Sequence, residues 1–324
     1  MCIALMDECL IFASVCAILM ISISIARHKE GKETMNLCDI REIKQIMNMF
    51  HLNFRKELGQ NFLTDRTVVE DIAGGCCDDR RSTILEIGPG IGTLSWALAE
   101  RYDKVIALEI DKGLIPVLSF TMGEYRNFSV VNEDVMKADL AALLGEDFAR
   151  GSVSVCANLP YYITTPILMK LLESGLPFDN ITIMIQSEVA DRLCARAGKS
   201  EYGAITAVLA YYGQAEALFT VPADRFVPAP KVNSTVVRIR LYKEKPYHPK
   251  DEALMFRTIK AAFEQRRKTL SNALSAAFSE LSKEQLTDII VACGHRADIR
   301  GEKLSITDFV VLSDAIGEAI KASK

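Results

Sequence analysis

Short apolar runs alternate with amphipathic segments along the chain from about Thr67 onward. Five of these runs are mainly apolar and predict strands, namely TILEIG, KVIALEI, FSVVNED, SVSVCAN and ITIMIQ. The segments between them have helical spacing, as in TVVEDIAGGC and TLSWALAERY. Continuous apolar strands separated by helices predict a parallel sheet that is covered on both faces. A late pair of runs, AEALFTV and STVVRIRL, predicts an antiparallel edge of the same sheet.

The pattern changes after Leu241. A polar, proline-containing linker, KEKPYHPKD, is followed only by helical patterns: ALMFRTIKAAFEQRRKTLSNALSAAF, KEQLTDIIVAC and SITDFVVLSDAIGEAIKA. We therefore expect an α/β fold of the Rossmann-like type over residues 35–243. A small all-helical domain is expected to follow over residues 244–324.

The first residues do not fit this arrangement. No charged residue occurs from Cys9 to Ala26, which is long enough for a membrane helix. Acidic residues precede this stretch and basic ones follow it, which disfavours a secretory signal and leaves a single anchor as one alternative. Met35 begins a helix-like segment, and Lys29–Gly31 can be encoded as AAGGAGG, a bacterial ribosome-binding sequence. We expect residues 1–34 to be a start-site artefact and the protein to be cytoplasmic, with no stable membrane partner.

Composition narrows the class of protein. Hydrophobic residues make up 49% of the chain, charged residues make up 25%, and the net charge is −4. An acidic balance argues against a generally basic nucleic-acid binder, so any contact with nucleic acid must use local patches. The nine cysteines lack paired CxxC spacing and the four histidines are scattered. We therefore expect reduced thiols and no metal site.

A glycine-rich turn follows the first predicted strand. In ILEIGPGIG, the residues Gly88, Gly90 and Gly92 stand between a strand and a helix. Glycines there allow close approach of the backbone to a ligand, and the helix N-terminus offers free N–H donors. A dinucleotide fingerprint requires a glycine where Thr93 stands, whereas an acid before G-x-G-x-G resembles the first motif of S-adenosylmethionine-dependent methyltransferases. A plain tight connection is the alternative interpretation.

Acidic residues mark the ends of the next two strands. Glu109 ends KVIALE, where a carboxylate can accept hydrogen bonds from both hydroxyls of a ribose. Asp134 ends the third strand, where its carboxylate can accept from the amino group of an adenine. Each acid alone is equally well explained as a solvated strand end. Ligands of open parallel sheets bind at this edge, so together the two acids predict a nucleoside site.

The fourth strand ends in Asn158, Leu159, Pro160 and Tyr161. The exocyclic amine of adenine is a poor nucleophile because its lone pair is delocalised into the ring. The side-chain oxygen of Asn158 and a main-chain carbonyl beside Pro160 can accept hydrogen bonds from that amine and direct its lone pair at a sulfonium methyl group. Tyr161 would stack on the base. An ordinary strand-end turn is the competing interpretation, and the role of Tyr162 is left open between packing and RNA contact.

Taken together, these segments resemble the ribosomal small-subunit RNA adenine dimethyltransferase family (the KsgA/Dim1 group). The resemblance extends from about Met35 to the C-terminus and rests on LGQNFL, EIGPGIGTLS, ALEID, NLPYYITTPIL, FVPAPKVNSTVVRI and FEQRRKTLSNAL. It implies a class I methyltransferase fold that transfers methyl groups from S-adenosylmethionine to N6 of two adjacent adenines near the 3′ end of small-subunit rRNA during late assembly. The residues it places around the cofactor are Asn61, Leu63, Gly88, Gly90, Glu109, Asp134 and Asn158.

The resemblance also implies that Phe226 sandwiches the target adenine opposite Tyr161. Pro228 and Pro230 stiffen the surrounding loop, so it can present an aromatic ring at a small entropic cost. A proline-stiffened loop with a core phenylalanine is the alternative for Phe226, and a helix cap or turn is the alternative for Asn61. Phe62 is expected to pack in the core.

Basic residues in the C-terminal segment suggest contact with RNA phosphates. Those expected to bind RNA are Arg266, Arg267, Lys268, Arg257, Lys260 and Lys231, with Arg55, Lys56 and Arg225 extending the patch towards the site. A solvated charged face of a helix is the alternative interpretation for such a run.

The predicted partners are small-subunit rRNA and the assembling small ribosomal subunit, and the protein is expected to be monomeric. Two other functions stay open. One is a large-subunit rRNA adenine methyltransferase of the macrolide-resistance type, and the other is a non-catalytic RNA-binding assembly factor on the same fold. The motifs NLPYYITTPI and QRRKTLSNAL favour the small-subunit group over the first. The retained Gly88, Glu109, Asp134 and Asn158 favour an enzyme over the second.

Overall fold

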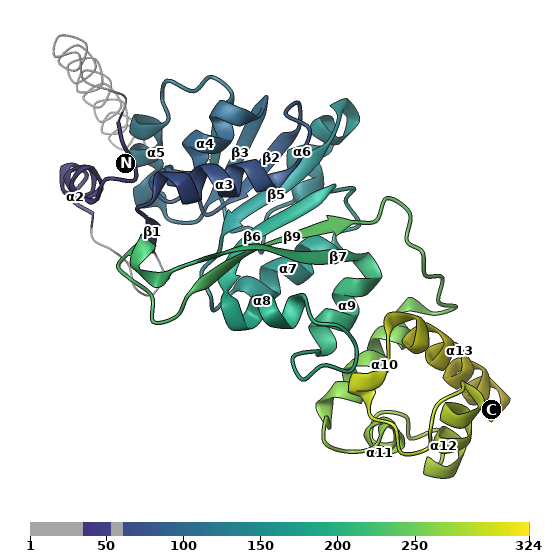
Figure 1. Ribbon diagram of the computed structural model, residues 1–324. Coiled ribbons are helices and arrows are strands. Elements are labelled where there is room, and N and C mark those ends of the chain that lie inside the picture. Colours follow the sequence, from purple (N-terminus) through teal and green to yellow (C-terminus); the bar gives the residue numbers. More distant parts are fainter. Residues whose placement is uncertain (1–34, 53–60, 324) are drawn as a thin grey trace, which may run out of the picture. The chain divides into compact units, whose positions relative to one another are not determined.

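The computed structural model describes residues 35–52 and 61–323 of the chain. The predicted extension, residues 1–34, lies outside the described residues. In chain order the helices and strands are α2 (Ile40–Met49), β1 (Phe62–Leu63), α3 (Arg66–Cys76), β2 (Thr83–Ile87), α4 (Thr93–Arg101), β3 (Lys104–Glu109), α5 (Ile115–Thr121), β4 (Phe128–Asn132), α6 (Leu140–Arg150), β5 (Val153–Asn158), α7 (Thr164–Glu173), β6 (Asn180–Gln186), α8 (Ser187–Leu193), α9 (Ala204–Tyr212), β7 (Gly213–Val221), β8 (Phe226–Val227), β9 (Ser234–Leu241), α10 (Glu252–Glu264), α11 (Leu270–Ser275), α12 (Lys283–Ala292) and α13 (Ile306–Ala322) (Figure 1).

Most of the strands belong to one sheet. Among the described residues its order is β4-β3-β2-β5-β6-β9-β7, while β1 and β8 form a separate two-stranded sheet (Figure 1). The strand β2 pairs in parallel with both β3 and β5, and β3 pairs in parallel with β4. The Rossmann-like parallel sheet predicted from the apolar runs is therefore confirmed. The late pair, β7 and β9, lies at one edge of the order, as predicted.

Burial explains why the central strands lack an alternating pattern. Every residue of β2 is buried, and Leu85, Val105 and Val155 have no exposed surface. Helices cover both faces of such a sheet, so successive side chains enter apolar surroundings on either side. The strand β4 ends the order and has partly exposed residues throughout, as expected of an edge strand.

By their contacts the described residues form two compact units. The first unit contains the described residues up to Leu171 together with Thr182–Met184 and Val221–Ser234, and the second unit contains the remainder. In the first unit α3 packs against α4 and β5, and α4 packs against β3. These units divide the chain at positions other than the predicted boundary between 243 and 244, which stays a prediction.

The helix α2 supports one side of the first unit. The Asp39 side chain caps it by accepting from the Arg41 N–H. Its buried face, Ile43, Ile46 and Met47, packs in an apolar cluster whose other buried members are Leu37, Phe62, Ile91, Leu114 and Val117. Within residues 35–52 and 61–323, no helix is long and apolar enough to cross a membrane.

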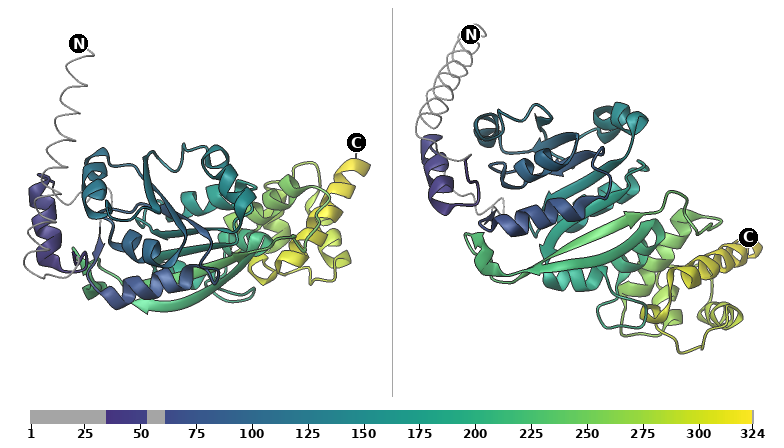
Figure 2. Two further views of the ribbon diagram at one scale, coloured as in Figure 1. Left: turned by 90° about the horizontal axis from the view of Figure 1, so that it is seen from above. Right: turned by 45° about the horizontal axis from the view of Figure 1, so that its top comes forward.

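The second unit ends in a run of helices, which the green-to-yellow part of the chain shows in both views of Figure 2. Their core includes Met255, Phe278 and Phe309, all without exposed surface. The helical pattern predicted from Ala253 to Phe278 is divided between two helices. The helix α10 ends at Glu264, and Arg266–Lys268 lie in a turn before α11.

Candidate active site

A cavity lies where the parallel strands of the first unit end. Parallel strands bring their carboxyl ends to the same edge of a sheet, so residues after β2, β3, β4 and β5 meet there. The empty space among them, open solvent at the mouth included, is about 1180 Å³. Ten predicted residues line it: Asn61, Leu63, Gly88, Gly90, Glu109, Asp134, Asn158, Leu159, Pro160 and Tyr161.

The glycine turn has the backbone that its sequence predicts. Gly88, Gly90 and Gly92 have φ values of 71°, 62° and 93°, in the left-handed region that side chains disfavour. A Cβ on Gly90 would lie 3.2 Å from Cε1 of Phe62, so the backbone passes this ring closely. A Cβ on Gly88 would meet nothing within 4 Å, which leaves that side open to the cavity.

Glu109 is held by main-chain donors from both sides. Its Oε2 accepts from the Gly90 N–H at 3.2 Å, and its Oε1 accepts from the Asp111 N–H at 2.7 Å. The side chain is 4% exposed, and burial raises the pKa of its carboxyl despite these two bonds. The glycine turn and the end of β3 are thus joined through one carboxylate at the cavity wall.

Glu86, the acid that precedes the glycine turn, lines the cavity but was not among the residues predicted to bind the cofactor. It is 1% exposed, and burial raises the pKa of its carboxyl to about 8, with the Glu109 carboxylate adding to the rise. The nearby Ser95 hydroxyl lowers this pKa in part, but neither Ser95 Oγ nor Glu86 Oε2 has a hydrogen-bond partner among the described residues. Glu86 Oε2 can therefore bond to a ligand in the cavity. In the sequence, the place of this acid two residues before Gly88 was the feature that could have identified it.

Asp134 stands in the loop after β4 rather than at the strand end, because β4 stops at Asn132. Its Oδ1 accepts from the Met136 N–H at 2.9 Å, which forms a short turn beside the cavity. The side chain of Asn132 fixes the neighbouring strand end by donating to the Glu109 carbonyl at 2.7 Å. Glu133 and the exposed Ile110 also line the cavity, although neither was among the predicted site residues.

The turn after β5 is fixed by four hydrogen bonds. The Asn158 Nδ2 donates to the Asn61 carbonyl at 3.4 Å, which leaves the side-chain oxygen of the same amide available. The Pro160 carbonyl accepts from the Ile163 N–H at 3.2 Å and from Thr164 Oγ1 at 3.3 Å. The Tyr161 hydroxyl bonds Ser234 Oγ at 2.8 Å. Tyr162, in contrast, lines the cavity with 64% of its surface exposed.

Phe226 is placed differently from the other predicted residues. It lies in β8, which pairs antiparallel with β1 so that Phe226 faces Leu63 in register. The side chain is 2% exposed and does not line the cavity. This burial favours the core-packing alternative, and stacking on a base stays a prediction. Phe62 is 6% exposed and packs in the apolar cluster with α2, as expected, while it also lines the cavity.

Three of the residues predicted to bind RNA make contacts within the protein. Arg266 donates to the carbonyls of Ser200 and Tyr202, the latter at 3.0 Å, and pairs with Glu302 at 3.3 Å. Arg257 donates to the Ala277 carbonyl and lies 4.4 Å from the ring centroid of Phe278. The Lys260 ammonium lies 3.9 Å from Glu264 on the same helix.

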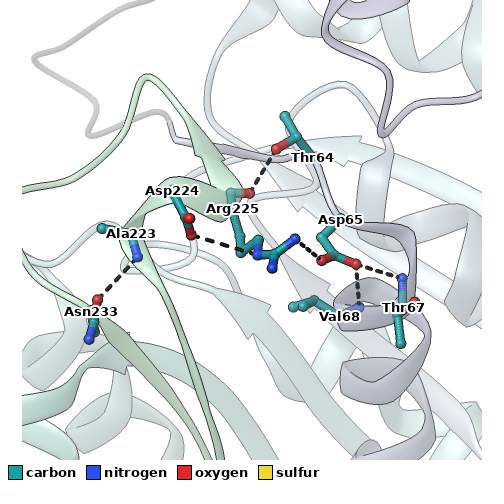
Figure 3. Close-up of polar contacts among 8 residues, drawn as sticks. All are labelled: Thr64, Asp65, Thr67, Val68, Ala223, Asp224, Arg225 and Asn233. Atoms are coloured by element: carbon teal, nitrogen blue, oxygen red, sulfur yellow. Dashed lines mark hydrogen bonds and ion pairs between the residues drawn. The ribbon is translucent and has the colours of Figure 1, made fainter.

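Among the other predicted RNA-binding residues, Arg267, Lys268 and Lys231 are exposed. Arg267 and Lys268 lie in the turn between α10 and α11, and Lys231 lies in the loop between β8 and β9. Arg225 pairs with Asp65 inside the first unit (Figure 3). Arg55 and Lys56 lie outside the described residues. Within the described part of the chain, no group of three or more His, Cys, Asp or Glu residues is arranged to hold a metal ion.

Known proteins share this sequence pattern. The sequence model of the family described as "Ribosomal RNA adenine dimethylase" matches residues 51–310. The chain belongs to the ribosomal RNA adenine dimethylase family. A relative in this family, "Ribosomal RNA small subunit methyltransferase A" of Alkaliphilus oremlandii, is 44% identical over 86% of this chain and 98% of its own length. The protein of the same name from Lachnoclostridium phytofermentans is 42% identical over 88% and 99%.

Solved structures agree with this family on the fold. A dimethyladenosine transferase from Plasmodium falciparum superposes with a TM-score of 0.64 at 22% identity, over 77% of this chain and 95% of its own. The 23S rRNA methyltransferase ErmE superposes with a TM-score of 0.62 at 23% identity, over 79% and 99%. At these identities the likeness shows the methyltransferase fold alone. The class I fold implied by the resemblance is therefore confirmed.

Proposed function

We propose that this member of the ribosomal RNA adenine dimethylase family transfers methyl groups from S-adenosylmethionine to N6 of two adjacent adenines near the 3′ end of small-subunit rRNA. The observation that carries the proposal is the meeting of Gly90, Glu109 and the Asn158–Tyr161 turn at one cavity. Gly90 and Glu109 can bind the nucleoside part of the cofactor, and the turn can bind the exocyclic amine of the target adenine. The product is N6,N6-dimethyladenosine, formed as the subunit nears completion in the cytoplasm.

The residues present fit the cofactor. The carboxylate of Glu109 lies at the strand end where a ribose binds in such folds. The N–H groups of Gly90 and Asp111 donate to it and so fix the orientation of its oxygens. Oε2 of Glu86 is buried beside the cavity and has no hydrogen-bond partner among the described residues, so a polar group of the ligand can bond to it. Gly88 leaves open space on the cavity side. When bound, S-adenosylmethionine supplies an electrophilic methyl group on a sulfonium, so no metal ion is needed.

The turn after β5 would orient the N6 amine of adenine, which receives the methyl group. The hydrogen bond from Asn158 Nδ2 to the Asn61 carbonyl orients the Asn158 amide. Its side-chain oxygen can therefore accept a hydrogen bond from the N6 amine of adenine. A second acceptor from the main chain beside Pro160 would hold the other proton. With both protons held, the nitrogen lone pair points away from the ring, and it can attack the methyl carbon as the bond from that carbon to sulfur breaks. The nitrogen then loses a proton to solvent. Positioning and electrostatics supply the catalysis.

Tyr161 would place the base. Its hydroxyl is tied to Ser234 Oγ at 2.8 Å, which fixes the ring at the cavity wall. Stacking of a nucleobase on such a fixed ring stabilises a base that has left its helix by about 1–3 kcal/mol. The exposed side chains Lys231, Arg267 and Lys268 are the ones we assign to RNA phosphates.

The small-subunit substrate is favoured by the relatives of high identity, whose names specify the small subunit. The likeness to a 23S rRNA methyltransferase is at 23% identity and concerns the fold. An assembly factor without catalysis would not require Glu109, Asn158 and Tyr161 to meet at a cavity. We expect the protein to act as a monomer on the assembling small subunit.

The test is methyl transfer from labelled S-adenosylmethionine to ribosomal subunits from cells that lack the modification. Small and large subunits are offered separately and then in competition. Label in the small-subunit rRNA alone supports the proposal. Label in the large-subunit rRNA would support the macrolide-resistance type of activity, and label in neither would leave an assembly factor.

A further inference from the structure

The segment that contains β8 and leads into β9 is closed at its base and joined to the cofactor side of the cavity. We call this segment, residues 223–233, the β8 loop. The Ala223 N–H donates to Asn233 Oδ1 at 3.1 Å, which ties the two ends of the loop together (Figure 3). Within this loop Lys231 and Val232 are exposed, and Val232 has 46% of its surface open to solvent. The loop therefore presents these two side chains to solvent.

Arg225 connects this loop to the segment that leads into α3. Its NH1 donates to Asp65 Oδ2 at 2.9 Å, and its carbonyl accepts from the Thr64 N–H at 2.9 Å and from Thr64 Oγ1 at 3.1 Å (Figure 3). The Asp224 carboxylate lies 3.6 Å from Arg225 Nε on the other side. The adjoining residues pair as β1 and β8, with two residues in each strand.

Asp65, the acidic member of this ion pair, is held in place by a second set of contacts. Asp65 Oδ1 accepts from the Thr67 and Val68 N–H groups at 3.0 and 3.3 Å and so caps α3, which leaves Oδ2 for Arg225 (Figure 3). The cap already orders the carboxylate, so the pair costs less side-chain entropy than an ordinary exposed pair. Two-residue strands are marginal by themselves, so the side-chain contact adds needed support.

The geometry points to Arg225 as a positioning residue that couples the β8 loop to the cofactor side of the cavity, an inference that rests on the proposed function. The cavity residues Asn61 and Leu63 immediately precede Thr64 and Asp65, the two residues that hold Arg225. At its far end the loop is followed by Ser234, which bonds Tyr161. Binding at the Asn61–Leu63 segment therefore orders the RNA-facing loop through Arg225.

The substitution Arg225→Gln removes the charge and leaves a shorter polar side chain that lacks the Nη1 group bonded to Asp65. We expect kcat/KM for the RNA substrate to fall about fivefold, which corresponds to about 1 kcal/mol and is the upper end for an exposed pair. The dissociation constant of the cofactor should stay within about twofold. Arg225→Lys, which retains the charge, should recover part of the loss. The matched control is Arg150→Gln, which breaks an exposed ion pair with Glu146 on α6 and touches no cavity residue.

The partner is tested by Asp65→Asn, because asparagine keeps the oxygen that caps α3 but loses the charge that holds Arg225. The double variant should lose no more activity than Arg225→Gln alone, since both changes remove one interaction. Additive losses, an unchanged kcat/KM in Arg225→Gln, or an equal fall in Arg150→Gln would each overturn the inference.

Amide hydrogen exchange gives a readout that does not depend on catalysis. S-adenosylhomocysteine should slow exchange at residues 61–65 and in the β8 loop of the unmodified protein, but only at residues 61–65 in Arg225→Gln. Equal slowing of the loop in both proteins would overturn the coupling. If the unmodified protein binds this ligand yet methylates no RNA, the proposed function fails while the exchange result still decides the inference.

Discussion

Replacing Gly90 with alanine perturbs the glycine turn at the point where it passes the ring of Phe62. The residue has a φ of 62°, a conformation that costs an alanine about 1–2 kcal/mol. The added Cβ would lie 3.2 Å from Phe62 Cε1, so this ring must move by a few tenths of an ångström. We expect a total loss of about 2 kcal/mol in the free energy of unfolding, which lowers the melting temperature by about 3 °C.

The same change should weaken cofactor binding. Phe62 stands between Asn61 and Leu63, and a displaced ring shifts both of these cavity residues. The Gly90 N–H also donates to Glu109, so a moved backbone alters the carboxylate. We expect the dissociation constant of S-adenosylhomocysteine, measured by titration calorimetry, to rise about tenfold, which corresponds to about 1.4 kcal/mol.

Gly175→Ala is the matched control. Gly175 has a φ of 69°, so it carries the same backbone cost, but a Cβ there would meet nothing within 4 Å and the residue does not line the cavity. This variant should melt slightly lower and bind the cofactor with unchanged affinity. A Gly90→Ala protein that binds the cofactor as tightly as the unmodified protein would refute the assignment of this turn to the cofactor.

Four further changes test other parts of the account. Asn158→Ala removes the side-chain acceptor and should slow single-turnover methyl transfer by about 100-fold or more, while filter binding shows RNA affinity within about twofold. Joint replacement of Arg267 and Lys268 by glutamine should weaken RNA binding and reduce the slope of log K against log salt by about 1–2. Arg266→Gln should instead lower the melting temperature, because its guanidinium binds main-chain carbonyls. Glu86→Gln should flatten the decline in unfolding free energy between about pH 5 and pH 8, measured by denaturant titration without cofactor.

The direction of the Glu86 effect follows from its raised pKa of about 8 against an ordinary value of 4.5. Between these values the unfolded chain has released the proton and the folded protein still holds it, so the free energy of unfolding falls as pH rises. Below pH 4.5 both states are protonated and no such loss occurs. Within the window the free energy of unfolding falls by about 1.4 kcal/mol for each pH unit. An identical pH dependence in Glu86→Gln would contradict the burial of an ionisable group there.

Local patterns were sufficient to predict the parts of the site that follow strands. Apolar runs located β2, β3 and β5, and parallel pairing then brought Gly88, Glu109 and Asn158 to one edge. Each of these residues stands at a fixed place relative to its strand, so the fold determines where it lies.

Contacts between distant segments could not be predicted in this way. The strands β1 and β8 have two residues each, which is too short for a periodic pattern, and the bond from Arg225 to Asp65 joins residues far apart in the chain. Phe226 is buried in β8, and its predicted stacking on the base stays a prediction. In the sequence nothing distinguishes Arg266 from its basic neighbours Arg267 and Lys268. Within the described structure Arg266 alone among the three donates to the carbonyls of Ser200 and Tyr202.

Mass spectrometry of the rRNA tests the central claim most directly. Small subunits that lack the modification are incubated with the purified protein and S-adenosylmethionine, and the 3′ portion of the rRNA is digested and mapped. The account predicts N6,N6-dimethyladenosine at two adjacent adenines, and its absence when Asn158→Ala replaces the unmodified protein. Unmodified adenines after incubation with a protein that binds the cofactor, or methyl groups on another base or atom, would contradict it.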